Sequence, residues 1–150
     1  MEMQRGDRIL RKNGFDPAEA KDRVTLEYEN RHRRRFRLFT EQHRDILLDL
    51  EQCEHMRDGD AIVLCDGSLV LVCARPEELL EITAESDLLM RIAWHLGNRH
   101  LAVQFADGKL LIRRDHVIAD MVCRLGGEVR PVLACFDPES GAYAAHGGTS

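Results

Sequence analysis

Long apolar runs are missing from this 150-residue chain, and aromatic residues make up only 5% of it. No stretch reaches the roughly 20 apolar residues that a membrane-spanning helix needs. The charged N-terminus lacks the apolar core of a signal peptide. We therefore expect a cytoplasmic protein with no membrane partner. The shortage of aromatic side chains favours small cores built from Leu, Val and Ile.

The cysteines are few and scattered, and no two of them form a Cys-x-x-Cys pair. This spacing suits neither a disulfide framework nor a zinc ribbon. It favours cysteines that serve as small buried apolar residues in a reducing compartment. The five cysteines are Cys53, Cys65, Cys73, Cys123 and Cys135.

Recognisable catalytic motifs are also absent. The sequence has no Gly-x-Ser-x-Gly, no phosphate-binding loop, no His-Glu-x-x-His and no cysteine with an evident base. A catalytic zinc site usually takes three protein ligands from one chain, and this chain offers two well-placed histidines at most. A metallohydrolase is therefore a poor candidate, and we expect a protein that is not an enzyme.

The negative net charge argues against a protein that binds nucleic acid strongly and without sequence preference. The formal net charge is −5, whereas strong nonspecific nucleic-acid binding needs a basic surface. Residues 1–75 carry 14 basic and 15 acidic side chains, and residues 76–150 carry 7 and 11. The second half is therefore the acidic one, which is mildly favourable for a divalent cation.

The first half is typical of a β domain. Residues 1–22 are polar and show no clean periodicity, but apolar and polar residues alternate over residues 24–28 and again further on. Asp66-Gly67 separates two short apolar runs, which is a strong hairpin signal. We predict a small all-β, partner-binding domain over residues 1–75.

Beyond Pro76 the pattern changes. Ser86 is a candidate N-cap, and apolar residues recur at i, i+3, i+4 and i+7 from Leu89 onward, which indicates one face of a helix. Gly97 is placed to end this helix in the left-handed conformation. We expect the chain to enter a strand directly after it, at residues 101–105.

The remaining elements complete a mixed domain. Strands are predicted over residues 79–83, 101–105, 109–113 and 129–136, with a second helix over residues 115–125. The order βαββαβ is the ferredoxin-like arrangement. The predicted fold class is therefore α+β: a small all-β domain, then a ferredoxin-like domain over residues 76–140 that binds metal and dimerises, then a flexible tail over residues 141–150.

Histidines flank the predicted helix end. The string Trp-His-Leu-Gly-Asn-Arg-His occupies residues 94–100, and His116 follows alone. Imidazole suits nickel, copper and zinc. His100 lies five residues after His95, so the two cannot share one face of a continuous helix. His100 is either a metal ligand or a histidine that bonds a backbone carbonyl at a helix–strand junction.

Other candidate functional residues stand alone in the sequence and are judged from their expected position on a helix or strand. His116 lies opposite the apolar stripe of the second helix, so it should face solvent, either as a ligand or as an ordinary surface histidine. An exposed Trp94 would suggest that its helix meets a second copy of the chain; alternatively, Trp94 packs over its neighbours. His32, His43 and His55 lack ligand-like spacing and are expected at the surface.

Basic residues gather over residues 31–37, Arg-His-Arg-Arg-Arg-Phe-Arg. This cluster could bind an acidic partner. The alternative is a strand whose outward positions are charged, which discourages pairing at a sheet edge.

The string of residues 94–100, with Gln104 after it and Arg-Asp-His-Val at residues 114–117, resembles the urease accessory nickel metallochaperone family, UreE. The resemblance implies an N-terminal β domain that engages protein partners and a C-terminal ferredoxin-like domain that binds metal and forms a homodimer. It also implies delivery of nickel to the urease apoenzyme, together with other accessory proteins that include a GTPase.

The resemblance also assigns ligands. His100 matches the family's central ligand, given by each protomer across the dimer axis, and His116 matches a peripheral ligand. Many members have another histidine where this chain has Arg114, and many end in a histidine-rich tail where this one has only His146. We expect about one nickel ion per dimer, at a site that copper or zinc could also occupy. The alternative is a metal-independent adaptor of an assembly complex, with structural histidines.

Overall fold

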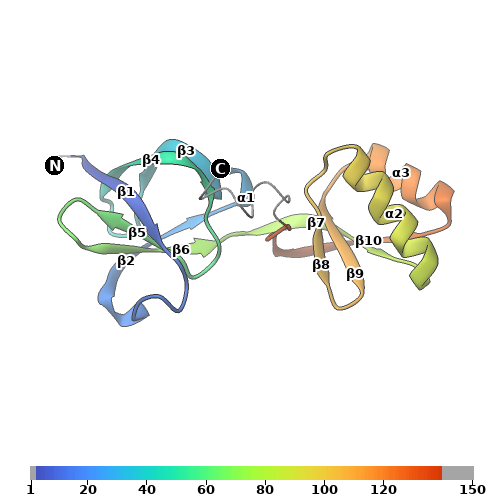
Figure 1. Cartoon of the computed structure of the whole chain (residues 1–150), viewed down its shortest axis with the longest axis horizontal. Helices are drawn as coiled ribbons and strands as arrows, with labels where there is room; N and C mark the ends of the chain where they lie inside the picture. The colour runs from blue at the N-terminus through green and yellow to red at the C-terminus, as the bar shows by residue number, and fades with distance from the viewer. Residues whose placement is uncertain (1–2, 140–150) are drawn as a thin grey trace. The chain divides into compact units, whose positions relative to one another are not determined.

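The computed structural model describes residues 3–139, which divide into two compact units between Arg75 and Pro76. Each unit has its own sheet and core, and Figure 1 labels the elements of both. No helix among the described residues is long and apolar enough to cross a membrane. The predicted tail over residues 141–150, with His146, lies outside the described residues.

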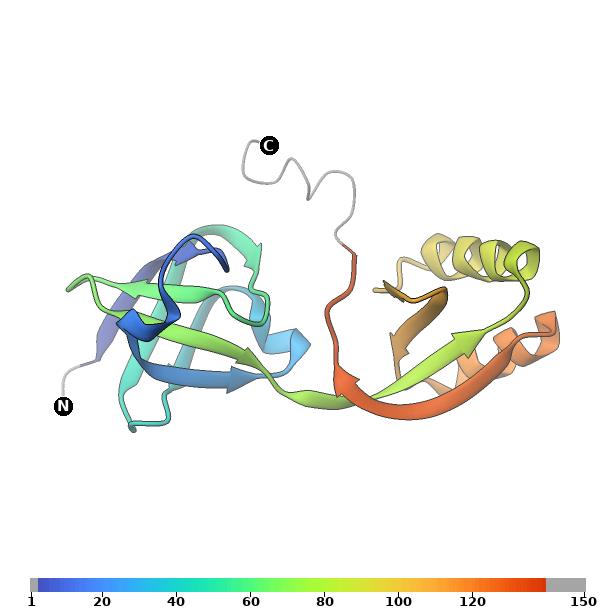
Figure 2. The ribbon, with the colours of Figure 1, turned by 90° about the horizontal axis from the view of Figure 1, so that it is seen from below.

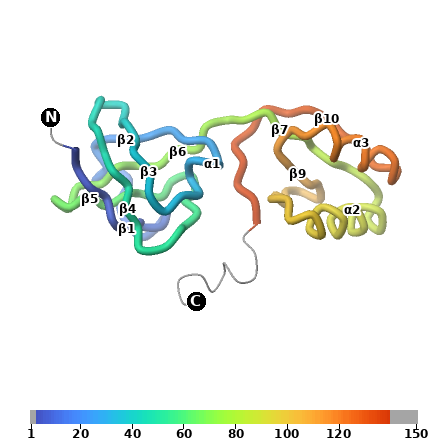
Figure 3. The backbone as a smooth tube through the Cα atoms, turned by 90° about the horizontal axis from the view of Figure 1, so that it is seen from above, coloured from blue at the N-terminus to red at the C-terminus, as the bar shows by residue number. Residues whose placement is uncertain are grey.

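The first unit is built on a six-stranded mixed sheet in the order β2-β6-β5-β1-β4-β3. β1 pairs in parallel with β4, and β2 in parallel with β6; the other pairs are antiparallel. The edge strand β3 lies beside β4, as the tube in Figure 3 also shows. The elements are β1 Gln4–Leu10, a 3-10 turn Pro17–Glu19, β2 Ala20–Leu26, α1 Tyr28–Arg31, β3 His32–Phe39, β4 Asp45–His55, β5 Ala61–Leu64 and β6 Leu69–Ala74.

The prediction of a β-rich unit is confirmed, but two local expectations are wrong. Strand β1 lies within residues 1–22, where no periodicity was visible. Its buried position is Gly6, and a Cβ there would lie 2.5 Å from Ile62 Cγ2. A strand that buries a glycine carries little apolar signal. Tyr28, predicted in a strand, instead begins the short helix α1, which Arg31 anchors with a buried guanidinium that donates to Leu26 O.

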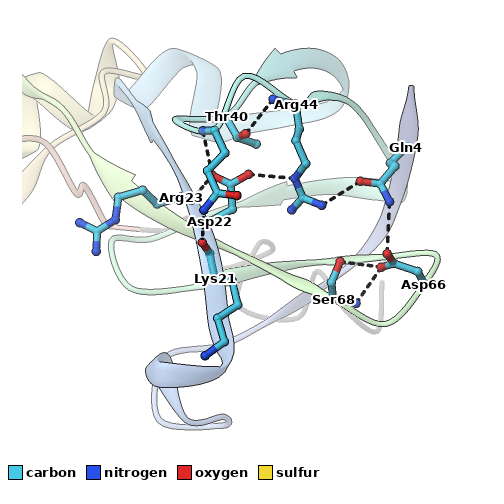
Figure 4. A network of polar contacts seen from close by, with 9 residues as sticks. Gln4, Lys21, Asp22, Arg23, Thr40, Arg44, Asp66 and Ser68 are labelled. Atoms are coloured by element: carbon cyan, nitrogen blue, oxygen red, sulfur yellow. Dashed lines mark hydrogen bonds and ion pairs between the residues drawn. The ribbon is translucent and has the colours of Figure 1, made fainter. Parts of the chain in front are cut away.

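A polar network ties the strands of this unit together (Figure 4). The Asp22 carboxylate, 0% exposed, accepts hydrogen bonds from Arg44 Nε at 2.9 Å and from two backbone N–H groups. Arg44 also donates to Gln4 Oε1 at 3.0 Å, and Gln4 donates to Asp66 at 3.2 Å. Burial alone would raise the pKa of Asp22, but the hydrogen bonds from Thr40, Arg44 and the backbone lower it below the ordinary value of 3.8.

The second unit has a four-stranded, fully antiparallel sheet in the order β10-β7-β9-β8. Two helices cover one face of it (Figure 1) and share a core that includes Ile82, Ile92 and Val122. This arrangement confirms the ferredoxin-like prediction. The elements are β7 Pro76–Thr83, α2 Ser86–Asn98, β8 Gln104–Ala106, β9 Lys109–Arg113, α3 His116–Leu125 and β10 Glu128–Cys135.

The turns of this unit follow the sequence signals. Asp107 and Gly108 both have positive φ, 51° and 74°, as a tight two-residue hairpin turn requires. Asp115 caps α3, since its side chain accepts hydrogen bonds from the backbone N–H groups of Val117 and Ile118. Gly126, with φ 102°, closes the same helix.

The cysteines do not occupy the positions we expected. Four of them are exposed, and only Cys73 is partly buried. The reason is their place in each element: Cys53, for example, lies in the exposed second half of β4, and Cys123 lies on α3 beside the buried Val122. No disulfide is present among residues 3–139. Burial raises the pKa of the Cys73 thiol, which disfavours a thiolate ligand there.

Candidate metal centre

Helix α2 ends later than predicted, and His100 takes the left-handed position that was predicted for Gly97. Gly97 remains helical, the helix continues to Asn98, and His100 is the residue with left-handed backbone, φ 59°. The His100 N–H bonds Gly97 O at 2.9 Å, and the Leu101 N–H bonds Leu96 O at 3.2 Å. These two bonds define a Schellman motif with His100 at the position that glycine usually takes.

This conformation is costly for a residue with a Cβ. Left-handed backbone costs an L-residue about 1–2 kcal/mol relative to the right-handed form, and such strain concentrates at functional sites. The motif is held by packing, because Leu96 and Leu101 belong to the same apolar core. Glycine would adopt this conformation without that cost.

The His100 side chain is exposed. Within residues 3–139 its imidazole has no hydrogen bond, so the alternative of a histidine that bonds a backbone carbonyl is not observed. The prediction that His100 enters a strand is also wrong. β8 begins only at Gln104, because residues 99–103 are used to turn the chain out of the helix. His100 thus projects from a tight turn.

The outer face of α2, which we define by Met90, Trp94 and Gly97, lies opposite the buried Ile92 and Leu96. Met90 is 67% exposed and Trp94 is 63% exposed, and the Trp94 ring also packs edge-on against the His95 ring, with 5.1 Å between their centroids. Met90 was not predicted from the sequence as a member of this face, although it lies four residues before Trp94. A Cβ at Gly97 would meet nothing within 4 Å. This face is therefore apolar and open to a close approach.

His116 is the first residue of α3 and faces solvent, as expected. In the antiparallel sheet each helix returns the chain along the strands, so the end of α2 and the start of α3 lie at the same end of the helix layer (Figure 2). The structure records no contact between the His100 and His116 side chains. Among the described residues, no group of three or more His, Cys, Asp or Glu side chains could hold a metal. One copy of the chain therefore does not assemble a three-ligand site of these residue types within residues 3–139.

Two further residues of the sequence motifs have structural contacts. Arg114 forms an exposed ion pair with Glu78 on β7 at 3.1 Å, and a guanidinium has no acceptor atom that could bind a metal ion. Gln104 Oε1 accepts a hydrogen bond from the Asp137 N–H at 2.9 Å. Gln104 thus helps to fix the chain that follows β10.

The histidines of the first unit were expected at the surface. His32 and His43 are exposed, but His55 is only partly exposed. His32 and His55 are paired residues on adjacent strands, and their rings lie close together with the ring of Tyr28. This group could not be predicted from the sequence, since its two histidines are far apart in the chain and are brought together by the strand register.

Two family models match the chain. The model described as the N-terminal domain of the UreE urease accessory protein matches residues 7–75, and the model of its C-terminal domain matches residues 77–150.

Individual relatives agree with these models. A protein of Rhodopseudomonas palustris strain HaA2 is 53% identical over 133 residues, which are 87% of this chain and 62% of that relative. One from Bradyrhizobium sp. strain ORS 278 is 49% identical over 150 residues, covering 97% of this chain and 71% of its own length. A third, from Ruegeria pomeroyi, is 48% identical over 132 residues, with 88% and 87% covered. All three are named urease accessory protein UreE.

Proposed function

The chain belongs to the UreE family of urease accessory proteins, and from this membership we propose that it is a cytoplasmic metallochaperone that delivers Ni²⁺ to the urease apoenzyme. The family name describes an accessory protein of urease and not an enzyme. Delivery would occur in a complex with other urease accessory proteins, among them a GTPase. The second unit would carry the metal, and the first would engage protein partners.

The observation that carries the proposal is the position of His100. Its exposed imidazole has no hydrogen bond to the part of the chain that the structure describes, and it stands on a tight turn in a backbone conformation that favours glycine. Imidazole is a good ligand for Ni²⁺. A rigid turn fixes the direction of the ring, while solvent exposure leaves it available to an ion. Both properties suit a ligand that binds cargo.

We propose that two copies of the chain complete the nickel site. Each copy would give His100, with His116 as a peripheral ligand, and water or mobile side chains would fill the remaining positions. The outer face of α2 supports a contact between copies, since it exposes Met90 and Trp94 next to an unobstructed Gly97. A site shared between copies would also account for the missing three-ligand group among the residues that the structure describes.

Such an open site can release its ion. Two neutral imidazoles would hold the ion, and positions filled only by water would let a recipient protein supply its own ligands. Protons compete for the imidazole nitrogens, so nickel binding should weaken as the pH falls through the range in which histidine titrates.

A glycine substitution tests the ligand without straining the turn. His100→Gly removes the imidazole and suits φ 59°, whereas alanine would keep the strain. His43→Gly is a matched control, because His43 is also exposed and left-handed, φ 62°, but belongs to the other unit. By isothermal titration calorimetry, we expect His100→Gly to lose the strongest nickel site and His43→Gly to keep it. Unchanged nickel affinity in His100→Gly would refute the proposal.

One observation favours a second candidate. Arg114, paired with Glu78, stands where many family members have a histidine, which reduces the supply of ligands. A metal-independent adaptor of the urease assembly complex would tolerate this loss. Equilibrium dialysis against Ni²⁺ separates the two candidates, since an adaptor would retain no nickel at micromolar concentrations of the metal.

A further inference from the structure

Three rings of the first unit form a compact group that the proposed nickel site does not use. The ring cluster consists of Tyr28, His32 and His55. The centroids of the two imidazoles are 5.7 Å apart, and the tyrosine ring lies 5.9 Å from His32 and 5.2 Å from His55. Two imidazoles at this separation can reach one ion between them, because metal–nitrogen bonds are about 2 Å long.

The backbone fixes this arrangement. His32 and His55 are directly paired across the antiparallel strands β3 and β4, which keeps their Cβ atoms about 5 Å apart on one side of the sheet. The residues next to them are bonded to each other: the Met56 N–H donates to Arg31 O at 2.7 Å, and Arg31 Nη1 donates to Met56 O at 3.1 Å. The two histidines are therefore preorganised before any ion arrives.

The tyrosine restrains the rings further. Tyr28 opens α1, and His32 follows that helix at its C-terminal end, so one helical turn brings the two rings together. The rings of Tyr28 and His32 are stacked, with an angle of 23° between their planes. Packing on a rigid neighbour reduces the rotamer freedom that an imidazole loses when it binds an ion.

The basic side chain that contacts the backbone of the cluster has acidic partners. Arg11 donates to Glu54, to the buried Asp60 and to the backbone carbonyl of His55. These two carboxylates limit the repulsion between Arg11 and a bound cation. The Arg33 guanidinium lies over the Phe36 ring, 4.9 Å from its centroid. His32 itself is exposed and accessible from solvent.

From this geometry we propose a second metal site in the first unit, in which His32 and His55 bind one Cu²⁺ ion and Tyr28 holds the imidazoles in place. Among divalent first-row ions Cu²⁺ binds nitrogen ligands most tightly. Water fills the other positions of the tetragonal ion. The site is separate from the candidate nickel centre, which lies in the other unit.

The test uses the whole chain with the nickel ligands removed. In a His100→Gly, His116→Gln background, Cu²⁺ is titrated and followed by electron paramagnetic resonance, where coordinated nitrogens give a resolved splitting. His32→Asn is added to remove one ligand from an exposed position. His43→Asn is the matched control, because asparagine tolerates its left-handed backbone and the histidine count stays equal.

We expect His32→Asn to weaken Cu²⁺ binding at least tenfold, since even the loss of a partner that only orients a ligand costs roughly 10- to 100-fold. The nitrogen splitting should simplify at the same time, and His43→Asn should change neither readout. His55→Gln should reproduce the loss in a protein whose circular dichroism is unchanged. Equal Cu²⁺ affinity and equal splitting in His32→Asn and His43→Asn would overturn the proposal and leave the ring cluster as packing alone.

Discussion

Gly97 occupies a helical position at which glycine is not required. Its backbone is that of an ordinary helix residue, and it precedes the left-handed residue by three positions. A Cβ there would have no neighbouring atom within 4 Å among residues 3–139. Glycine in a helix interior is less stable than alanine. The residue is therefore explained better by something that approaches α2 from outside than by the fold of one copy.

Replacing this glycine should separate folding from association. We predict that Gly97→Ala raises the stability of one copy by about 0.5–1 kcal/mol, and that it weakens the association of two copies through the outer face of α2. Urea denaturation at a protein concentration below the dissociation constant measures the first effect, and sedimentation equilibrium measures the second. A dimer as tight as the unmodified one would contradict the proposed contact.

A second prediction at the scale of the residue concerns the contribution of Asp22 to the stability of the first unit. Its carboxylate is fully buried and accepts several hydrogen bonds, one of them from Arg44. Asp22→Asn should therefore destabilise the first unit by about 1–3 kcal/mol, the range for a hydrogen-bonded charged group. Urea denaturation at neutral pH measures the loss.

Because its pKa is lowered in the folded state, the Asp22 carboxylate should make the stability of the first unit depend on pH. The folded state holds the pKa of Asp22 below 3.8, so the unfolded state binds the proton more readily. The stabilisation is fully present above that ordinary value, and it is lost as the pH falls through the lower folded pKa. The stability difference from Asp22→Asn should shrink over this acid range. A difference that stays constant down to the acid end would show that the charge contributes nothing.

At the scale of the element, α3 depends on its first turn. Asp115 accepts two backbone N–H bonds there, from Val117 at 2.9 Å and Ile118 at 3.2 Å. Asp115→Ala should cost about 0.5–2 kcal/mol, the range measured for the loss of an N-cap. Asp115→Asn keeps an acceptor and should cost much less. Thermal denaturation compares the three proteins, and an equal loss in both variants would assign the effect to charge instead of capping.

Some elements could be predicted because a local rule decides them. Asp107-Gly108, a dipeptide typical of tight hairpin turns, precedes the strand predicted over residues 109–113, and Asp115 and Gly126 bound the helix predicted over residues 115–125. Other elements depend on tertiary packing. β1 buries a glycine against Ile62, and α1 is anchored by the guanidinium of Arg31 inside the unit. Neither contact leaves a periodic pattern in the sequence, so neither element could be predicted.

The end of α2 shows why a local rule can fail. Glycine at position 97 resembles a C-cap, yet the Schellman bonds place the left-handed residue at His100. Leu96 and Leu101 both pack into the core of the second unit, and the burial of these two side chains favours this register of the turn. The sequence could identify His100 as a ligand through its resemblance to a family, but not the conformation that presents it.

At the scale of the whole molecule, the chain consists of two units with separate cores. The candidate nickel ligands lie in the second unit, and the ring cluster lies in the first. The sequence could not reveal the ring cluster, because its members are joined by the pairing of β3 with β4. The prediction for the basic residues 31–37 was partly wrong. Residues 32–37 lie on the edge strand β3, as one of the two alternatives stated, but Arg31 is buried inside the unit.

The central claim is that one nickel ion is held between two copies of His100. The most direct test measures bound nickel and molecular mass on the same sample, by equilibrium dialysis followed by light scattering. We predict about one tightly bound ion for each pair of chains, in a dimer, with no tightly bound ion in His100→Gly. One ion held by a single chain, or the same nickel content in His100→Gly, would contradict it.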